Sequence, residues 1–408
     1  MSKSLDVYLN QNLVGNLVQD KHGQMTFTYA SEWLSNRLAT PLSQSLPLQK
    51  ESFRQKQCRG YFAGILPEEN KRDLIAHNLG ISAKNDFAML ERIGGECAGA
   101  VTFIKAGENL PTQSTDYRLV DDEGLLKLID TLPTRPLMAG IDGIRLSLAG
   151  AQDKIAVHVK EGKVSIPLGG APTTHILKPA NERFKGVVFN EAFCLNLASL
   201  IGIPAARADV HSLLGKNYLL VERYDRRFVE IDVLERLHQE DFCQALGIVS
   251  EMKYETEGGP TLKTCFDLLR RISSKPVVDL QHLLDAVIFN YLIGNNDAHG
   301  KNFSILYNGG SASFSPLYDT LSTVYYQELS PNMAMKIGGE FHSEKINKIH
   351  FEKLAEDAGL AKPRVVERLS ELAEKITINL DKVPIRSQTT KELTQLITGR
   401  CERVLKLL

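Results

Sequence analysis

The sequence predicts an α+β protein of two or three domains, and three observations lead to this prediction. The chain has 408 residues, more than one ordinary hydrophobic core usually holds. Its first hundred residues contain short segments in which apolar and polar side chains alternate, as they do in β-strands. Residues 236–408 instead contain long apolar and amphipathic runs with the period of α-helices.

Composition is typical of a globular protein of the cytoplasm. Hydrophobic residues make up 43% of the chain and charged residues 24%. The formal net charge of −1 provides no general attraction for nucleic acid, so DNA contact would need a local patch or a partner. The six cysteines contain no C-x-x-C pair, which is typical of reduced core thiols. There is no leader-like N-terminus and no apolar run of membrane-span length, so we expect a soluble, intracellular protein.

The N-terminal residues are predicted to form a small α+β module with the boundaries 1–106. The glycine pair Gly94-Gly95 does not follow a strand, so it indicates a turn and not a dinucleotide-binding loop. Polar residues after this module predict a linker over 107–139. The elements expected in the module are a β-hairpin over 3–18, a strand over 25–29, and helices over 71–79 and from 86 onward.

Residues 140–235 begin with a bend of small residues, Leu148-Ala149-Gly150, between two strands predicted within 144–159. Small side chains let backbone N–H groups approach an anion closely, as glycine-rich phosphate loops do. The bend matches neither the Walker A nor the G-x-G-x-x-G pattern. Two interpretations stay open, a phosphate cradle and an ordinary hairpin turn, and the local pattern favours the turn.

Two further segments carry residue types that a nucleotide site uses. Lys178 ends a short predicted strand, and Glu191 lies in the helical run 190–201. In kinases a strand lysine contacts the α- and β-phosphates and a helix glutamate holds it. Glu222 and Tyr224 follow a buried strand, where a hinge would pair with adenine. Taken alone these are surface charges and edge-strand backbone, but the loop that comes after them favours the functional interpretation.

The polar loop 294–302 is the strongest functional signal. It follows an apolar helical run, precedes a predicted strand over 303–307, and holds Asp297 and Asn302 in the spacing D-x-x-x-x-N, with Asp319 further on. Phosphoryl transfer needs a carboxylate that accepts the proton of the attacking hydroxyl, and oxygen ligands that hold Mg²⁺ against the phosphates. Asn, Asp and Gly also form plain solvated turns. The combination of residues favours phosphoryl transfer.

The rest of the C-terminal part is predicted to be mostly helical. Its basic side chains at Lys362, Arg364, Arg368 and Lys375 are typical of a solvated helix face, and a DNA-facing surface is the minority interpretation. The expected elements are a leading loop and helix over 236–247, then helices over 262–272, 283–293, 351–380 and 391–408.

With these segments in this order, the chain resembles the HipA family of bacterial serine/threonine-kinase toxins over nearly its whole length. The resemblance implies a protein-kinase-like, two-lobed fold of the phosphatidylinositol-3-kinase type. The nucleotide-binding lobe and hinge would span 140–235, and a helical lobe with the catalytic loop would span 236–408. The segments that carry the resemblance are 39–48, 61–68, 97–101, 146–154, 175–179, 221–226, 239–241 and 296–302.

The resemblance also implies ATP and Mg²⁺ as cofactors and a role for each candidate residue. Asp297 would be the catalytic base, with His299 and Lys301 helping to hold the phosphates. Ser147 would be autophosphorylated, which ejects its loop from the ATP site, because a dianionic phosphate there repels ATP. The expected metal ligands are Asn302 and Asp319, and the expected nucleotide-binding residues are Leu148, Ala149, Gly150, Lys178, Glu222, Tyr224, Gln239 and Tyr318.

The partners that the resemblance implies are a protein substrate, an antitoxin and DNA. The substrate would be an aminoacyl-tRNA synthetase, with glutamyl-tRNA synthetase as the best-known case. The antitoxin would be a HipB-like helix-turn-helix protein, and operator DNA would be contacted mainly through it. The complex would repress its own operon. The expected location is the cytoplasm, with nucleoid association in the complex and no membrane contact.

Two alternatives remain beside this interpretation. The same site could transfer AMP or act on a small molecule, because the sequence does not identify the acceptor. The chain could instead be a catalytically weak co-repressor that acts through the antitoxin–DNA complex. A degenerate kinase usually loses one residue of the set Lys178, Asp297, Asn302 and Asp319, and all four are present.

Overall fold

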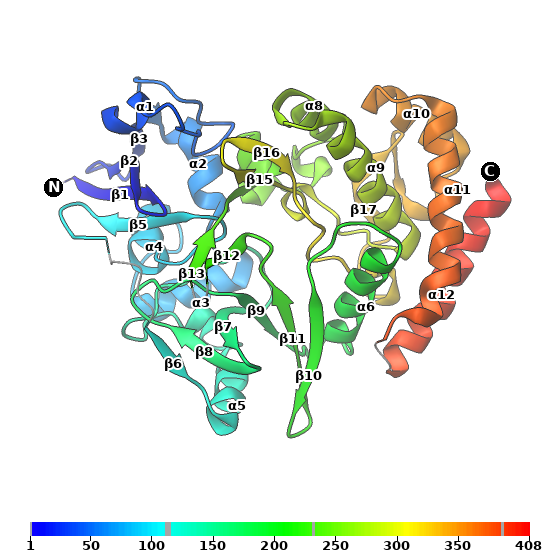
Figure 1. The fold of residues 1–408 in the computed structure, drawn as a ribbon, viewed down its shortest axis with the longest axis horizontal. Coiled ribbons are helices and arrows are strands. Elements are labelled where there is room, and N and C mark those ends of the chain that lie inside the picture. Colours follow the sequence, from blue (N-terminus) through cyan, green and yellow to red (C-terminus); the bar gives the residue numbers. More distant parts are fainter. Residues whose placement is uncertain (1, 111–115, 231–232, 385–386) are drawn as a thin grey trace.

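The computed structural model describes residues 2–110, 116–230, 233–384 and 387–408. Figure 1 shows the N-terminal region, in blue and cyan, at one end and the C-terminal helices, in yellow-green to red, at the other. Strands in green lie between them. The predicted α+β architecture with a largely helical C-terminal lobe is therefore confirmed.

The N-terminal module is built on a five-stranded antiparallel sheet. Along β3, Met25, Phe27 and Tyr29 are buried and the residues between them are only partly buried, so alternation in the sequence gives the sheet one apolar face. The predicted hairpin is present, with β1 and β2 paired antiparallel. In sheet order the strands are β4 (Phe53–Arg54), β3 (Met25–Tyr29), β2 (Asn12–Gln19), β1 (Lys3–Leu9) and β5 (Val101–Lys105). The helices are α1 (Ser31–Ser35), α2 (Gln55–Gly64), α3 (Glu69–Leu79) and α4 (Asp86–Ile93).

A six-stranded antiparallel sheet with two helices forms the middle of the molecule. Two of its strands, β9 and β11, border the cleft described below, and α6 carries the glutamate that faces it. In sheet order the strands are β10 (Ala208–Leu213), β11 (Lys216–Glu222), β9 (His175–Pro179), β7 (Ile155–Lys160), β8 (Lys163–Pro167) and β6 (Tyr117–Leu119). The helices are α5 (Asp122–Thr131) and α6 (Val187–Leu200).

Two predictions for this region are wrong. The predicted linker 107–139 contains β6 and α5, because Tyr117 pairs with Pro167 and Leu128 packs into the core; positions 111–115 lie outside the described residues. In the segment 144–159 only the second half is a strand. The first half is an extended loop with two isolated bridges, Glu96↔Leu146 and Pro67↔Gly150, because its backbone hydrogen-bonds to the N-terminal module.

The C-terminal region packs helices against a small sheet and around the central helix α9 (Pro276–Ile293). The leading loop predicted at 236–241 is wrong, because these residues end one strand and form the next, which pairs with β15 from His238↔Tyr307 to Asp241↔Ser304. The strands are β12 (Arg226–Glu230), β13 (Val233–Arg236), β14 (His238–Asp241), β15 (Ser304–Asn308), β16 (Ser311–Phe314), β17 (Asn332–Ile337) and β18 (Glu340–His342). The further helices are α7 (Phe242–Ala245), α8 (Leu262–Ile272), α10 (Lys348–Ala358), α11 (Lys362–Asn379) and α12 (Gln388–Leu407).

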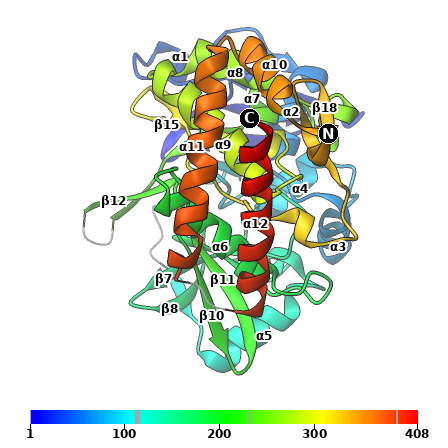
Figure 2. The same cartoon turned by 90° about the vertical axis from the view of Figure 1, so that its right-hand side faces the viewer.

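Two long helices close the C-terminal end. The stretch predicted as helical over 351–380 is divided, because Gly359 takes a left-handed conformation with φ of +64° and ends α10. Figure 2 shows the next two helices, α11 and α12, side by side across this end. They bury Leu369, Leu372 and Ile397 in one core with α6, α8 and α9.

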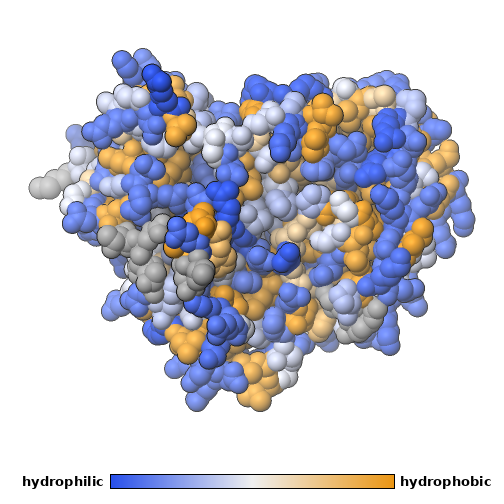
Figure 3. Space-filling model, in the orientation of Figure 1, coloured by the Kyte–Doolittle hydropathy of each residue, from blue (hydrophilic) through white to orange (hydrophobic). Residues whose placement is uncertain are grey.

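A second hydrophobic core joins the N-terminal module to the six-stranded sheet, since Leu66, Leu128 and Ile155 belong to one cluster. Hydrophilic side chains cover most of the face in Figure 3, and hydrophobic ones appear in small separate patches. Within the described part of the chain, none of the helices combines the length and the apolar character that crossing a bilayer requires.

A buried network of charged groups also joins the N-terminal module to the segment after β11. The carboxylate of Glu96 accepts hydrogen bonds from Arg226 at 2.8 Å and Arg236 at 2.7 Å, and Arg223 contacts it at 3.2 Å. Asp225 accepts from Arg223 at 2.8 Å and from the backbone N–H of Gly99 at 2.7 Å. Burial alone would raise the pKa of Glu96, but the three guanidinium groups hold it well below its usual range.

Replacement of Glu96 is expected to destabilise the protein strongly. Glu96→Gln leaves the buried guanidinium groups with too little negative charge, and breaking a buried ion pair from one side costs about 3–5 kcal/mol. Urea unfolding measures this loss. The matched control is Glu235→Gln, which removes the exposed partner of Arg227 and should cost less than about 1 kcal/mol. Equal losses for the two variants would contradict the structural role of Glu96.

Candidate active site

The predicted loop at 294–302 lies at the end of α9 and faces a cleft of about 900 Å³. The helix ends at Gly294, whose φ of +76° lets its N–H bond back to Asn290 and Tyr291. A side chain there would meet Val324 at 2.3 Å, so the position requires glycine. The loop then folds on itself, with the N–H of Asp297 donating to the side chain of Asn295 at 3.1 Å.

Asp297 is exposed to this cleft, and one of its carboxylate oxygens is already engaged. The Tyr254 hydroxyl donates to Oδ1 of Asp297 at 2.7 Å. Removal from bulk water raises the pKa of Asp297, while the Tyr254 hydrogen bond and the nearby Lys253 ammonium act in the opposite direction. The other carboxylate oxygen is the group that can accept a proton from a substrate hydroxyl.

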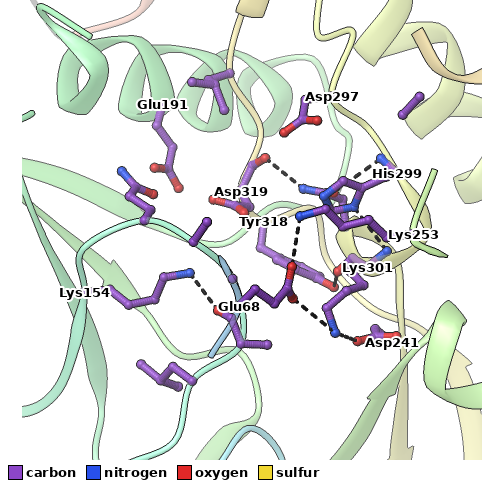
Figure 4. A pocket seen from close by; sticks show the side chains of 18 of the residues that line it. Glu68, Lys154, Glu191, Asp241, Lys253, Asp297, His299, Lys301, Tyr318 and Asp319 are labelled. Atoms are coloured by element: carbon purple, nitrogen blue, oxygen red, sulfur yellow. Dashed lines mark hydrogen bonds and ion pairs between the residues drawn. The ribbon is translucent and has the colours of Figure 1, made fainter. Parts of the chain in front are cut away.

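Lys178 and Glu191, which lie on β9 and α6, are brought together as an ion pair. The Lys178 ammonium donates to Oε1 of Glu191 at 2.6 Å and to Oδ1 of Asp319 at 2.7 Å. Burial alone would lower the pKa of Lys178, but the two carboxylates outweigh this effect and raise it. The lysine is therefore a permanent cation in the wall of the cleft. Figure 4 shows Glu191 and Asp319, its two carboxylate partners, near one another.

Asn302 and Asp319 lie next to one another, as the expected metal site requires. Asn302 Nδ2 donates to the backbone carbonyl of Asp319 at 3.3 Å. Asp319 has a left-handed φ of +51°, which is unusual for a residue with a side chain and is typical of functional sites. Burial alone would raise the pKa of Asp319, but Lys178 and Lys154 hold it well below its usual range. An ionised carboxylate beside an amide oxygen is a donor set that fits Mg²⁺.

His299 lies at the start of the short 3₁₀ turn Gly300–Asn302 and orders it. Its ring nitrogen Nδ1 accepts from the backbone N–H of Lys301 at 3.3 Å, and the backbone N–H of His299 donates to Oδ1 of Asn302 at 3.3 Å. Burial, followed by the neighbouring Lys253 ammonium, lowers the pKa of His299 to about 3. The imidazole is therefore neutral at physiological pH, and its contacts hold Asn302 in position.

Lys301 lines the cleft, but its ammonium is turned away from Asp297. It donates to Asp241 at 2.7 Å and to the carbonyl of Gly64 at 3.0 Å, and lies 3.6 Å from Glu68 (Figure 4). Burial alone would lower its pKa, but these two carboxylates raise it. The expected role in holding phosphates does not correspond to this placement, in which Lys301 ties the catalytic loop to α7 and to the N-terminal module.

The residues expected on the adenine side gather around two tyrosines whose rings are tilted against each other. The rings of Tyr224 and Tyr318 lie 5.5 Å apart at 33°, and the Tyr224 hydroxyl donates to Gln239. The Tyr318 hydroxyl donates to the carbonyl of Lys301 at 2.6 Å, which connects this end of the cleft to the catalytic loop. Glu222 also borders the cleft, and its side chain is exposed.

The small-residue bend forms the opposite wall. Leu148, Ala149 and Gly150 border the cleft, and Gly150 has a φ of +100° that glycine adopts without strain. Ser147 is turned away from the cleft and fully buried, with its hydroxyl donating to the carbonyl of Ile65 at 3.0 Å. In this arrangement Ser147 is out of reach of a phosphate in the cleft.

Sequence reasoning missed several residues of the site. The Lys154 ammonium donates to the carbonyl of Ala149 at 2.9 Å and lies over the bend, where a lysine soon after small residues could have signalled it. Lys253, Tyr254 and Glu68 gave no comparable signal, because no local pattern connects them to Asp297. Only the fold brings them together.

Replacement of Lys301 is expected to act on stability. Lys301→Met leaves the buried Asp241 and Glu68 with less compensating charge, which should cost about 3–5 kcal/mol in urea unfolding. Lys263→Met is the matched control, because it breaks an exposed ion pair with Asp267 on α8 and should cost less than about 1 kcal/mol. An unchanged unfolding midpoint for Lys301→Met, with lost activity, would instead assign the lysine to the chemistry.

Comparisons with known proteins show the family to which the chain is related. The profile of the HipA N-terminal domain matches residues 5–104, and that of the HipA-like C-terminal domain matches residues 146–380. The chain is 30% identical to the serine/threonine-protein kinase toxin HipA of Shewanella oneidensis, over 98% of this chain and 96% of the toxin. It is 47% identical to Y4mE of Sinorhizobium fredii, for which kinase activity is proposed, over 91% of this chain and 89% of that protein.

A solved structure agrees as well. It is the HipA–HipB–operator DNA complex of the Shewanella oneidensis toxin–antitoxin system, which matches with a TM-score of 0.87 and 28% identity. The match covers 99% of this chain and 98% of that chain. The two-lobed, kinase-like fold expected from the sequence is thereby confirmed. The chain belongs to the HipA family of serine/threonine-protein kinase toxins.

Proposed function

We propose that this chain transfers a phosphoryl group from ATP to a serine or threonine hydroxyl of a protein. The observation that carries the proposal is the convergence of Asp297, Asn302 and Asp319 in one cleft with Lys178, which is itself paired with Glu191. These groups supply a base, two hard oxygen ligands and a fixed cation, which are the parts that phosphoryl transfer requires.

Each part has a specific task in the proposed reaction. Asp297 accepts the proton of the acceptor hydroxyl on the carboxylate oxygen that Tyr254 leaves free. Lys178 holds phosphate oxygens, with Glu191 fixing its position. Asn302 and Asp319 would hold Mg²⁺, which would supply positive charge against the phosphates. Tyr224 and Tyr318 give the adenine end an aromatic wall, and the cleft volume of about 900 Å³ lies within the range of nucleotide-sized sites.

The acceptor and the partners are proposed from the family. An aminoacyl-tRNA synthetase, with glutamyl-tRNA synthetase first, is the proposed substrate, and its phosphorylation would stop translation. A HipB-like helix-turn-helix antitoxin would neutralise the chain and connect it to operator DNA. The similarity to a HipA–HipB–operator DNA complex supports this assembly. The protein would then act in the cytoplasm and associate with the nucleoid through the antitoxin.

Autophosphorylation of Ser147 is the proposed off-switch. The buried hydroxyl must leave its hydrogen bond with Ile65 before it can be phosphorylated, so the bend has to detach from the N-terminal module. A phosphate dianion does not fit back into this dry pocket beside a carbonyl oxygen. The modified loop would stay outside and the wall of the nucleotide cleft would be lost.

A co-repressor without catalytic function is the second candidate, and the match to a DNA-bound complex is the observation that favours it. AMP transfer is a third possibility for the same cleft. The three functions differ in the group that is attached to a protein. A kinase attaches a phosphate, an AMP transferase attaches a nucleotide, and a co-repressor attaches nothing.

Mass spectrometry after incubation with Mg²⁺·ATP distinguishes these functions. We expect wild-type protein to gain one phosphate at Ser147 and Asp297→Ala to gain none, because loss of a general base lowers the rate about 10²–10⁴-fold. Chelation of Mg²⁺ by EDTA should also abolish the gain. A wild type that binds ATP but gains no mass would favour the co-repressor function. A gain of one AMP would favour nucleotide transfer.

Ser147→Ala should separate transfer from self-inactivation. We expect this variant to gain no phosphate at position 147 and to phosphorylate a synthetase at a constant rate, whereas the wild type slows as Ser147 is modified. A time course of phosphate incorporation measures both. Ser311→Ala, which removes an exposed serine of β16, should behave like the wild type. Equal slowing of both variants would contradict the switch.

A further inference from the structure

The segment Lys253–Tyr254 crosses the cleft and is attached to the catalytic loop at two points. The Tyr254 hydroxyl donates to Oδ1 of Asp297 at 2.7 Å, and the backbone carbonyl of Lys253 accepts from the N–H of Gly300 at 3.3 Å. The Tyr254 ring also meets the ring of His299 edge-on, with centroids 5.2 Å apart at 85°. Lys253 and Tyr254 thus contact both the backbone and the side chains of the loop that holds Asp297.

The other side of this segment is fixed to the N-terminal module. The ammonium of Lys253 donates to Glu68 at 2.9 Å and lies 3.4 Å from Glu69 at the start of α3 (Figure 4). Lys253 and Glu68 are buried, so this ion pair is protected from solvent. The carbonyl of Tyr254 accepts from the N–H of Gly259 at 2.9 Å and closes the following turn. These contacts leave the phenol little freedom relative to Asp297.

A fixed donor on one carboxylate oxygen has two chemical consequences. A hydrogen bond from a hydroxyl to an ionised carboxylate is strong and directional, so it selects one rotation of the Asp297 side chain. It also leaves a defined oxygen for the substrate. Three charged groups, Lys253, Asp319 and Glu69, also act on Asp297. Among the described residues, none of these three forms a hydrogen bond with its side chain.

We propose that Tyr254 is a positioning residue for Asp297, whose hydroxyl orients the carboxylate so that Oδ2 accepts the proton of the acceptor hydroxyl. The inference rests on the proposed function, because it assigns a task to Tyr254 in the same reaction. Tyr254 does not itself take up the proton. Burial and the neighbouring Asp297 carboxylate raise its pKa, so the phenol remains protonated and remains a donor.

The test compares Tyr254→Phe with the wild type in steady-state phosphorylation of a protein acceptor. Loss of one orienting hydrogen bond behind a reacting group typically lowers the rate about 10–100-fold. We expect kcat to fall by this factor while the KM for ATP and the unfolding midpoint stay within about 2-fold and about 2 °C of the wild type. Tyr325→Phe is the matched control: it removes a hydroxyl that donates to Glu392, outside the cleft, and should leave kcat unchanged.

A double-mutant cycle with Asp297→Asn separates positioning from a structural role. If Tyr254 acts through Asp297, Tyr254→Phe should cause no further loss once the carboxylate is gone. Three results would overturn the inference. Tyr254→Phe could lower kcat by the same factor with and without the Asp297 carboxylate, or leave kcat unchanged in the single variant. It could also lower kcat only because the affinity for ATP is weaker. If the double variant is too slow to measure, the split between kcat and the KM for ATP decides.

The proposed function can be overturned independently of the positioning role of Tyr254. Asp297→Asn as active as the wild type would remove Asp297 as the base, whatever Tyr254→Phe does. An inactive Asp297→Asn beside a fully active Tyr254→Phe would keep the proposed function and overturn only the positioning role.

Discussion

The ammonium of Lys178 lies between the carboxylates of Glu191 and Asp319, and this arrangement connects three separate parts of the chain. The lysine comes from β9, the glutamate from α6, and the aspartate from the loop after β16. Burial alone would lower the pKa of this lysine, and the two carboxylates counteract that effect. Its two ion pairs therefore hold the strand, the helix and the loop against one another at the cleft.

The N-terminal module is part of this site and more than an attached domain. Glu68 lies beside both Lys253 and Lys301, the carbonyl of Gly64 receives Lys301, and the carbonyl of Ile65 holds Ser147. On the far side of the cleft, Glu96 binds the guanidinium groups on both sides of Tyr224. The module thus contacts the loop 294–302, the small-residue bend and the segment after β11, all of which line the cleft.

The small-residue bend and the loop that holds Asp297 are attached to their surroundings by different numbers of contacts. Lys301 and His299 are buried and bonded on several sides, so the catalytic loop is rigid. Ser147 is held by one side-chain hydrogen bond and by a backbone hydrogen bond to Glu96. The carbonyl of Gly150 accepts a long backbone hydrogen bond from the N–H of Glu68 at 3.4 Å. Phosphorylation of Ser147, as proposed, would have to break these contacts and expose the buried segment around it.

The sequence by itself determined those parts of the protein whose signal is local. Alternation predicted the hairpin and β3, and apolar periodicity predicted α8 and α9. The spacing of Asp297, Asn302 and Asp319 pointed to a loop and a following residue that line the cleft. The prediction from sequence was wrong at 107–139 and 236–241. Polar residues form strands there because they pair with segments distant in the chain. Only the tertiary structure decided that Lys301 faces Asp241, that Ser147 is buried and that Tyr254 lies on Asp297. Such contacts join residues tens to hundreds of positions apart, and no local pattern encodes a distance of that kind.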